Sequence, residues 1–406
     1  MSKELIITLI NYDMGGAQRR AFSLANNFVK KGYNVYVLSV LGENSSLSFQ
    51  NHFSIDERVN VVFIPEYYKK HKKNKIVAKS EKIIKHKISF LKKLQLIFKP
   101  FKRFTETINY NINGFKKCCA LRSFMISHHD SIVINFGFNI YDRIHFAVKG
   151  LNCKIIYAET NASNKYSLGR FFNFTSKSIK KSNATVFQTV VEKEEHGLTK
   201  NPKAYVIHNP IKTDLPKPYE GNRNKTIVNF CRLSRQKNLL LLIQAFERFH
   251  SEFPDYKLEI YADSTDPNDF EYKNELMSFV FNNNLTDYVF LLPPTSDIHN
   301  IILNYAMFVS SSDYEGISNS MIEAMAIGLP CVCTDCGGGG AREMITDGEN
   351  GLLVPIGDVE ALKNAMIRMI TEEGLSKRCS KNAAKIRETH SIENIAEKWI
   401  EIINKI

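Results

Sequence analysis

The chain has 406 residues, of which 44% are hydrophobic and 11% aromatic, a composition that is typical of a globular protein and argues against wholesale disorder. This length exceeds what one hydrophobic core ordinarily serves, so two domains are expected. No window approaches the ~20 consecutive apolar residues of a membrane-spanning helix, and the first apolar run is too short for a signal peptide. We therefore expect the protein to stay in the cytoplasm.

The net charge of +12 is concentrated in one segment. Residues 66–122 contain fifteen Lys and two Arg against three Glu, a net charge of +14, which leaves −2 for the rest of the chain. Between Lys69 and Arg103 apolar residues recur at near-helical spacing among the lysines, which predicts a basic amphipathic insert that binds an anionic membrane surface. The alternative is a lysine-coated helix that packs on the N-terminal domain. Few aromatic residues alternate with the lysines, which argues against a nucleic-acid partner.

The first half of the chain predicts alternating strands and helices. A strand at 5–10 is followed by Gly15 and Gly16, and then by a helical pattern that carries Ala21, Leu24 and Phe28. Strand, glycine turn, helix and strand form the opening of a Rossmann-like unit. The further strands that we expect are at 33–40, 131–135, 154–158, 184–188 and 204–207. An N-terminal Rossmann-like domain over 1–210 is therefore predicted, with the basic insert at about 66–122.

The polar, proline-containing segment 211–225 predicts a linker, and the alternation then begins again. Strands are expected at 227–230, 257–261, 289–291, 307–310 and 331–334, and helices at 239–249, 274–281 and 319–327. These elements predict a second parallel-sheet domain over 226–390, with a central cleft between the two domains. The amphipathic helix at 391–406 can pack on either domain, including back on the N-terminal one.

Two carboxylates, Glu315 and Glu323, lie on either side of a predicted helix start, where Ser318 or Asn319 can cap the helix. A capped helix start presents unpaired backbone N–H groups, which suit a diphosphate. Carboxylates bind sugar hydroxyls through charge-assisted hydrogen bonds. A pair of glutamates eight residues apart is common on solvated helices, so the pair gains meaning only from its neighbours.

A second charged pair, Arg232 and Lys237, is expected at the end of a strand in the same domain. Two cations at this edge can neutralise a diphosphate leaving group without a metal ion. Cys331, Cys333 and Cys336 form a cluster with no further Cys pair or His close by, so we expect structural thiols and no metal site.

Several motifs together resemble those of glycosyltransferase family 4. They are "NYDMGGAQRRAFSLANNF" near the N-terminus, "VFQTVVEKEEHG" and "VIHNPI" before the linker, and "CRLSRQKN", "EGISNSMIEAMAIGLPCV" and "GENGLLVPIGD" in the C-terminal half. The resemblance implies a GT-B fold, an N-terminal acceptor-binding domain and a C-terminal domain that binds a nucleotide sugar. It also implies retention of anomeric configuration, with no cofactor and no metal ion.

The resemblance assigns roles to individual residues. Arg232 and Lys237 would hold the diphosphate of the donor, which we expect to be a UDP-linked hexose, while Glu323 would bind the ribose and Glu315 the transferred sugar. The remaining donor-binding residues expected from the resemblance are Gly15, Gly16, Gly316, Ile317, Ser318 and Asn319.

This chain departs from the family pattern at three positions. Cys231 and Ala262 stand where glycine is common, and Thr160 replaces a frequent histidine, which leaves Glu159 as a candidate on the acceptor side. The glycines at 337–340 form either a flexible donor loop or a strand-to-helix turn, of which ordinary glycine usage favours the turn.

The leading hypothesis is a transferase that extends a saccharide, lipid-linked and destined for a surface polysaccharide or glycolipid, at the cytoplasmic face of the inner membrane. A nucleotide-sugar epimerase and a non-catalytic nucleotide-sugar-binding partner are the alternatives. The motifs specify a donor and carry no information about the acceptor.

Overall fold

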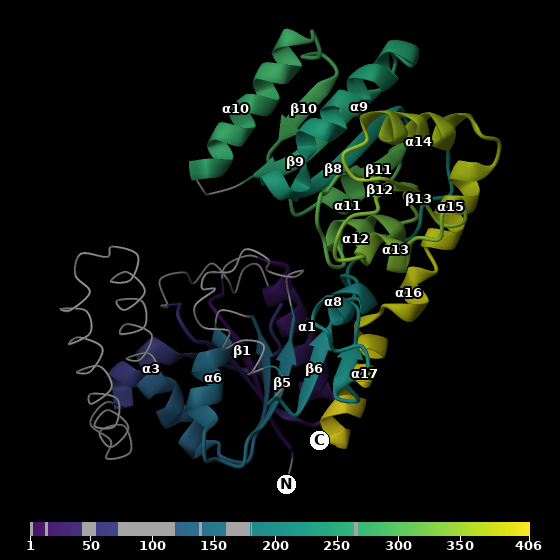
Figure 1. Cartoon of the computed structure of the whole chain (residues 1–406). Helices are drawn as coiled ribbons and strands as arrows, with labels where there is room; N and C mark the ends of the chain where they lie inside the picture. Colours follow the sequence, from purple (N-terminus) through teal and green to yellow (C-terminus); the bar gives the residue numbers. More distant parts are fainter. Residues whose placement is uncertain are drawn as a thin grey trace.

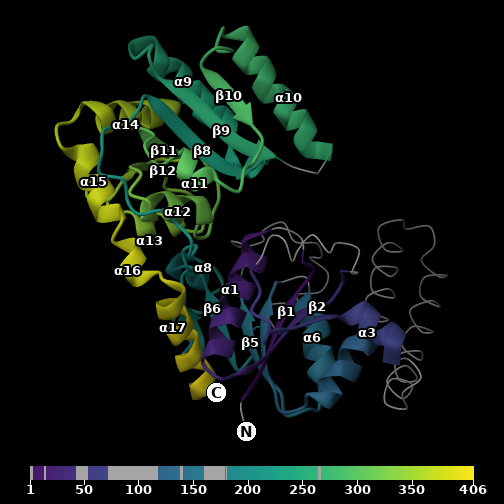
Figure 2. The same ribbon diagram turned by 180° about the vertical axis from the view of Figure 1, so that it is seen from behind.

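The computed structural model describes residues 3–12, 15–42, 54–71, 118–137, 140–159, 179, 181–263 and 267–406. The predicted amphipathic part of the basic segment, beyond His71, lies outside the described residues, as do Thr160 and its neighbour Asn161. The described residues form two domains, each built on a sheet of parallel strands with helices packed against it (Figures 1 and 2). The predicted pair of Rossmann-like parallel-sheet domains is confirmed.

The N-terminal domain contains a seven-stranded sheet in the order β3-β2-β1-β4-β5-β6-β7. Its strands are β1 (Glu4–Leu9), β2 (Asn34–Ser39), β3 (Asn60–Phe63), β4 (Ile132–Phe136), β5 (Lys154–Ala158), β6 (Ala184–Phe187) and β7 (Ala204–Val206). Its helices are α1 (Gly16–Lys30), α3 (Ile64–His71), α6 (Tyr141–Val148) and α8 (Val190–Glu195). Strand β1 is an almost unbroken apolar run because both faces of a parallel sheet are covered.

The C-terminal helix α17 (Ile392–Lys405) packs on the N-terminal domain, beside α1 (Figure 1). Its apolar face includes Ile395, Trp399 and Ile402, which recur at the spacing of one helix face and are buried in the same cluster as the apolar residues of α1. The Trp399 ring lies 5.8 Å from the ring of Phe136 in β4. The chain thus returns to its first domain after completing the second.

The C-terminal domain contains a six-stranded sheet in the order β10-β9-β8-β11-β12-β13. Its strands are β8 (Thr226–Arg232), β9 (Lys257–Asp263), β10 (Val289–Leu292), β11 (Met307–Ser310), β12 (Cys331–Thr334) and β13 (Leu352–Val354). Its helices are α9 (Leu239–Glu252), α10 (Pro267–Asn282), α11 (Ile298–Ile301), α12 (Asn319–Ala326), α13 (Gly340–Met344), α14 (Val359–Thr371), α15 (Leu375–Ala383) and α16 (Ile386–Thr389). Helices α9, α10, α14 and α15 share one apolar cluster, and α11, α12, α13 and α16 share another.

In both sheets the order in which the chain adds strands reverses inside the sheet, at a switch point. In the C-terminal sheet the chain builds outward from β8 to β10 on one side and from β11 to β13 on the other, so β8 and β11 are neighbours at the switch point. In the N-terminal sheet β1 and β4 occupy the same position. Open parallel sheets bind ligands beyond the carboxyl ends of the strands at such a point.

Every strand and helix predicted above that falls within the described residues is present, with boundaries that differ by a few residues and a larger extension of α10 toward its N-terminus. The prediction missed two strands, β3 and β13, and most of the shorter helices. The segment 211–225 forms neither helix nor strand, yet its Leu215 is buried in the core of the C-terminal domain. In the part of the chain that the structure describes, no helix is long and apolar enough to cross a membrane.

Candidate functional site

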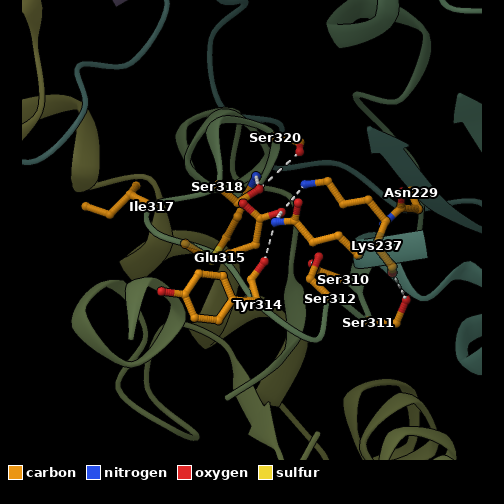
Figure 3. Close-up of polar contacts among 12 residues, drawn as sticks. Asn229, Lys237, Ser310, Ser311, Ser312, Tyr314, Glu315, Ile317, Ser318 and Ser320 are labelled. Atoms are coloured by element: carbon orange, nitrogen blue, oxygen red, sulfur yellow. Dashed lines mark hydrogen bonds and ion pairs between the residues drawn. The ribbon is translucent and has the colours of Figure 1, made fainter. Parts of the chain in front are cut away.

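Two loops meet at the switch point of the C-terminal sheet. One follows β8 and contains a short 3₁₀ helix, Arg235–Lys237, and the other follows β11. The backbone N–H of Asp313 donates to the carbonyl of Gln236 at 3.0 Å, and the Ser311 hydroxyl donates to the carbonyl of Lys237 at 3.0 Å (Figure 3). These bonds fix the two loops against each other.

Lys237 and Glu315 face each other across these loops and form an ion pair (Figure 3). Their side chains are 12% and 17% exposed, so the pair is shielded from bulk solvent but remains at the surface. The Gln236 amide donates to the same Glu315 oxygen at 3.4 Å. Arg232 ends β8 and is exposed, and it takes part in none of the ion pairs found among the described residues. The structure therefore brings Lys237 and Glu315 together and leaves Arg232 open to solvent beside them.

Cys231, one residue before Arg232, is not an ionised group. Burial raises the pKa of the Cys231 thiol to about 11, and the positive charge of Lys237 offsets only part of this effect. A thiol with this pKa stays protonated at neutral pH and is a poor nucleophile. Cys231 therefore serves as a small packing residue where the family pattern has glycine.

Glu323 lies in the second turn of α12, with its side chain 5% exposed and both oxygens engaged. Oε2 is 2.8 Å from Nε2 of His299 in α11, and Oε1 forms an ion pair with Arg19 of α1 in the other domain. Burial alone would raise the pKa of the Glu323 carboxyl, but the charge of Arg19 and the hydrogen bond from His299 outweigh it and lower that pKa. Glu323 is thus a buried carboxylate, ionised at neutral pH.

The start of α12 is built as the motif predicts. Ser318 is the N-cap, and its hydroxyl accepts a hydrogen bond from the backbone N–H of Met321 at 3.5 Å. Gly328, with φ of 72°, follows the helix and ends it. The glycines at 337–340 form a turn between β12 and α13, with positive φ at Gly338 and Gly339. This geometry supports the strand-to-helix turn.

The glycine loop of the N-terminal domain reaches the start of α12. A Cβ placed on Gly16 would lie 2.5 Å from the Nδ2 atom of Asn319, so the two domains approach each other closely at this point. Gly15 is the N-cap of α1 in an extended conformation that any residue adopts. The predicted donor-binding residues Gly16 and Asn319 are therefore neighbours, although they belong to different domains.

Hydrogen bonds hold the domains in this arrangement. The Asn209 amide donates to the carbonyl of Ile317 at 3.1 Å and to Oε1 of Gln188 at 2.9 Å. The Thr189 hydroxyl donates to the carbonyl of Gly338 at 2.6 Å. The backbone of the predicted sugar- and phosphate-binding loop is therefore fastened to the N-terminal domain.

Glu159, the candidate on the acceptor side, lies in a buried group of charged residues inside the N-terminal domain. Its carboxylate accepts a hydrogen bond from the Tyr157 hydroxyl at 2.9 Å. Its backbone carbonyl accepts from the buried guanidinium of Arg20, whose pKa burial lowers to about 10. Nearby, burial raises the pKa of Glu192 to about 8. Glu159 is only 4% exposed, so in this state it is not open to an acceptor.

The cysteine cluster is buried in the C-terminal domain. Cys331, Cys333 and Cys336 are buried free thiols, and burial raises the pKa of each. Throughout the described ranges, no group of three or more His, Cys, Asp and Glu side chains is arranged to hold a metal ion.

Comparison with known proteins finds a match to one family model over the C-terminal domain. Residues 211–386 match the family model described as "Glycosyl transferases group 1". Over this range, which is less than half of the chain, the C-terminal domain is similar to the group 1 glycosyl transferases. The matched range contains the four charged residues predicted to bind the donor, which are Arg232, Lys237, Glu315 and Glu323.

Curated glycosyltransferases are similar to this chain over all or part of its length. The chain is 28% identical over 258 residues to a poly(glycerol-phosphate) alpha-glucosyltransferase of Bacillus subtilis, a match that covers 62% of this chain and 37% of that protein. It is 33% identical over 165 residues, 41% of this chain and 42% of the relative, to the N-acetylgalactosamine-N,N'-diacetylbacillosaminyl-diphospho-undecaprenol 4-alpha-N-acetylgalactosaminyltransferase of Campylobacter jejuni. It is 24% identical to an uncharacterized glycosyltransferase of Haemophilus influenzae, with 96% of each chain covered. The chain thus spans less than half of the first two relatives and nearly all of the third.

A solved structure shares the whole fold. A mutant of S. aureus TarM, in complex with Fondaparinux, alpha-GlcNAc-glycerol and UDP, matches with a TM-score of 0.76 at 17% identity, and the match covers 99% of this chain and all of that one. The likeness shows the fold, and the predicted GT-B architecture is confirmed.

Sequence reasoning missed two residues that contact the Glu323 carboxylate, Arg19 and His299. Arg19 follows the Gly15–Gly16 pair by three residues, so its place in the first turn of α1 was a usable signal. His299 follows a proline-containing loop with no motif of its own, and only the fold brings it to Glu323.

Proposed function

We propose that this protein is a retaining glycosyltransferase that moves a hexose from a nucleotide diphosphate sugar, with UDP as the expected nucleotide, to a saccharide acceptor. The observation that carries the proposal is the pair of carboxylates at the switch point of the C-terminal sheet. Glu315 is paired with Lys237, and Glu323 lies buried just past the capped start of α12.

The geometry supports one division of roles. The diphosphate would lie at the start of α12, where backbone N–H groups and the helix dipole favour an anion. There it would draw the Lys237 ammonium from Glu315, with Arg232 as a second cation. Glu315 would then be free to accept hydrogen bonds from the sugar hydroxyls, and Glu323 would accept them from the ribose.

The proposed reaction needs no protein nucleophile. The bond between the sugar's anomeric carbon and the leaving phosphate oxygen breaks, and a bond from that carbon to the acceptor oxygen forms on the same face. The acceptor proton passes to the leaving phosphate, and the nucleoside diphosphate departs. Lys237 and Arg232 stabilise the negative charge that develops on the phosphate, which is the largest contribution such a site makes. We propose that this occurs without a metal ion or cofactor.

The names of the relatives support the finer parts of this proposal. Both the B. subtilis and the C. jejuni relatives are named for alpha linkages, and the common UDP-hexoses are themselves alpha-linked, which supports retention. The C. jejuni relative is named for a diphospho-undecaprenol-linked acceptor, which supports a lipid-linked saccharide on the route to a surface polysaccharide or glycolipid. The Lys-rich segment between residues 66 and 122 would attach the enzyme to anionic lipid at the cytoplasmic face of the inner membrane.

A ligand panel followed by a turnover assay tests the proposal. Thermal unfolding is measured with UDP-, GDP-, ADP- and TDP-linked hexoses, because a bound donor raises the apparent stability by mass action. The donor that stabilises the protein most is then incubated without acceptor. Slow release of free nucleotide and free sugar is expected from a transferase.

Other outcomes would contradict the proposal. Interconversion of the donor sugar would identify an epimerase, and tight binding without any turnover would identify a non-catalytic binding protein. Retention is checked separately by the anomeric configuration of the sugar at the first moment of release, where an inverted product would exclude it.

A further inference from the structure

The ion pair between Arg19 and Glu323 joins the two domains at the carboxylate proposed to bind the ribose. Arg19 lies in the first turn of α1 in the N-terminal domain, and its side chain is 30% exposed. Glu323 is 5% exposed, and its second oxygen is taken by His299. A ribose hydroxyl that approaches Glu323 therefore meets a carboxylate with no vacant oxygen.

His299 is the permanent partner of Glu323. It comes from α11 of the same domain and is only 7% exposed. Its ring packs edge-on against that of Phe230 at 5.9 Å. Removing it from Glu323 would require this packing to be broken, so His299 stays when a ligand arrives.

Arg19 is the exchangeable partner. It reaches Glu323 from another domain through a long side chain that is partly exposed. A cation in the first turn of a helix also lies near the positive end of the helix dipole, where it is disfavoured, and α1 has no acidic residue in that turn to offset this. Arg19 is therefore held at Glu323 by the carboxylate itself, and a competitor for that carboxylate releases it.

We propose that Arg19 is a positioning residue that occupies Glu323 in the donor-free protein, and that the ribose hydroxyls of the donor displace it. This inference rests on the proposed function, since it requires Glu323 to bind the ribose. The affinity for nucleotide is then set by a competition between Arg19 and the ribose for one oxygen. The exchange also removes one of the contacts that hold α1 against α12, so donor binding loosens the interface between the domains at that point.

A double-mutant cycle on nucleotide binding tests the proposal. UDP, GDP, ADP and TDP are titrated calorimetrically into the full chain, and the tightest of them is taken forward. Arg19→Ala should lower its Kd by about three- to fivefold, the upper part of the range expected when a partly exposed ion pair no longer competes. When Glu323→Gln is already present, Arg19→Ala should change Kd by less than about twofold, because the carboxylate charge with which Arg19 interacts is already gone and coupled sites are not additive.

Two further variants make the cycle specific. Lys31→Ala removes a cation at the C-cap of the same helix, where Lys31 pairs with Glu397 of α17 away from Glu323, and should leave Kd unchanged. Arg19→Lys keeps the charge and should return Kd toward the wild-type value. If Arg19→Ala fails to fold, Arg19→Lys is compared with Arg19→Gln, which removes the charge. The Kd of Arg19→Lys must then lie between the Kd of the wild type and that of Arg19→Gln.

The outcomes separate this inference from the proposed function. Two outcomes would overturn only this inference, provided that the wild type binds a nucleoside diphosphate. In one, Arg19→Ala weakens the binding; in the other, it changes Kd equally with and without Glu323→Gln. Either result would mean that Arg19 does not compete for Glu323. If neither wild type nor Arg19→Ala binds any of the four nucleotides, the proposed function fails and the inference fails with it. Tight binding that appears only in Arg19→Ala would support both.

Discussion

Charged residues in the two domains occupy different environments, although both domains are built on a parallel sheet with a central switch point. In the C-terminal domain Lys237 and Glu315 are paired at the surface, 12% and 17% exposed. In the N-terminal domain Arg20 and Glu192 are buried, and burial raises the pKa of Glu192 to about 8. The Lys237–Glu315 pair can exchange partners with a ligand, whereas Arg20 and Glu192 lie inside one domain, where burial disfavours the charged forms. The comparison assigns ligand binding to the surface pair and a pH-dependent effect on stability to the buried group.

The largest expected effect is on catalysis at the surface pair. Lys237→Ala should lower kcat by about 10²- to 10³-fold, the loss typical when one group that stabilises developing charge is removed. The protein should remain folded, because the pair is not part of the core. Steady-state transfer kinetics with the identified donor measure the effect, and circular dichroism checks the fold.

Lys363→Ala is the matched control for that variant. Lys363 is 17% exposed and paired with Glu252 and Glu360 in the same domain, away from the switch point. Its removal should leave kcat close to wild type. An equal loss in both variants would mean that the domain responds to any missing lysine, and the role of Lys237 would be withdrawn.

The next effect tests how rigidly the loop before α12 is held. Gly340 begins α13, and a Cβ at this position would collide with the backbone of Gly316 and Ile317. Backbone atoms cannot rotate away, so Gly340→Ala should destabilise the protein by about 3 kcal/mol, the upper part of the range for overpacking. Urea unfolding measures the change, and a variant as stable as wild type would show that the loop yields.

A smaller, pH-dependent effect tests the buried group. Because burial raises the pKa of Glu192 from 4.5 to about 8, the folded protein binds a proton there that the unfolded chain has released between these values. Where the folded state binds more protons than the unfolded state, the free energy of unfolding falls as pH rises. Glu192 should therefore lower the free energy of unfolding increasingly between about pH 4.5 and about pH 8. Glu192→Gln should therefore gain at least about 1 kcal/mol of stability relative to wild type between pH 5 and pH 8, given about 1.4 kcal/mol per pKa unit, and the difference should shrink steadily as pH falls toward 4.5.

Denaturant unfolding of both proteins at several pH values between 5 and 8 gives this difference directly. Glu194→Gln removes an exposed carboxylate from the same helix and should show a difference that stays flat across the range. A flat profile for Glu192→Gln as well would contradict the buried, protonated state.

The sequence predicted the elements that repeat a strong local pattern and missed those that depend on packing. The apolar strands and α1, α9 and α12 have spacing that can be recognised in any context. Strand β13 has only three residues, Leu352–Val354, and becomes a strand by pairing with β12. Helix α14 was missed although Leu362, Met366 and Met369 lie on one buried face, a periodicity that would have identified it.

The residues of the candidate site also differ in whether the sequence could predict them. Lys237, Glu315 and Glu323 were located because each stands in a motif beside a predicted strand end or helix start. Arg19 and His299 were not, because their meeting with Glu323 joins α1, α11 and α12 from two domains. Motif spacing carries information along the chain, and contacts between domains arise only when the two sheets are assembled.

The smallest expected effect concerns the contact between the domains. A Cβ on Gly16 would approach Nδ2 of Asn319, the end of a side chain that can rotate, in contrast to the fixed backbone beside Gly340. Alanine also favours the helix over glycine by up to about 1 kcal/mol, which offsets part of the cost. Gly16→Ala should therefore change the free energy of unfolding by less than about 1 kcal/mol. Urea unfolding alongside Gly340→Ala provides the comparison, and equal losses in the two variants would mean that the interface between the domains is as rigid as the interior of one of them.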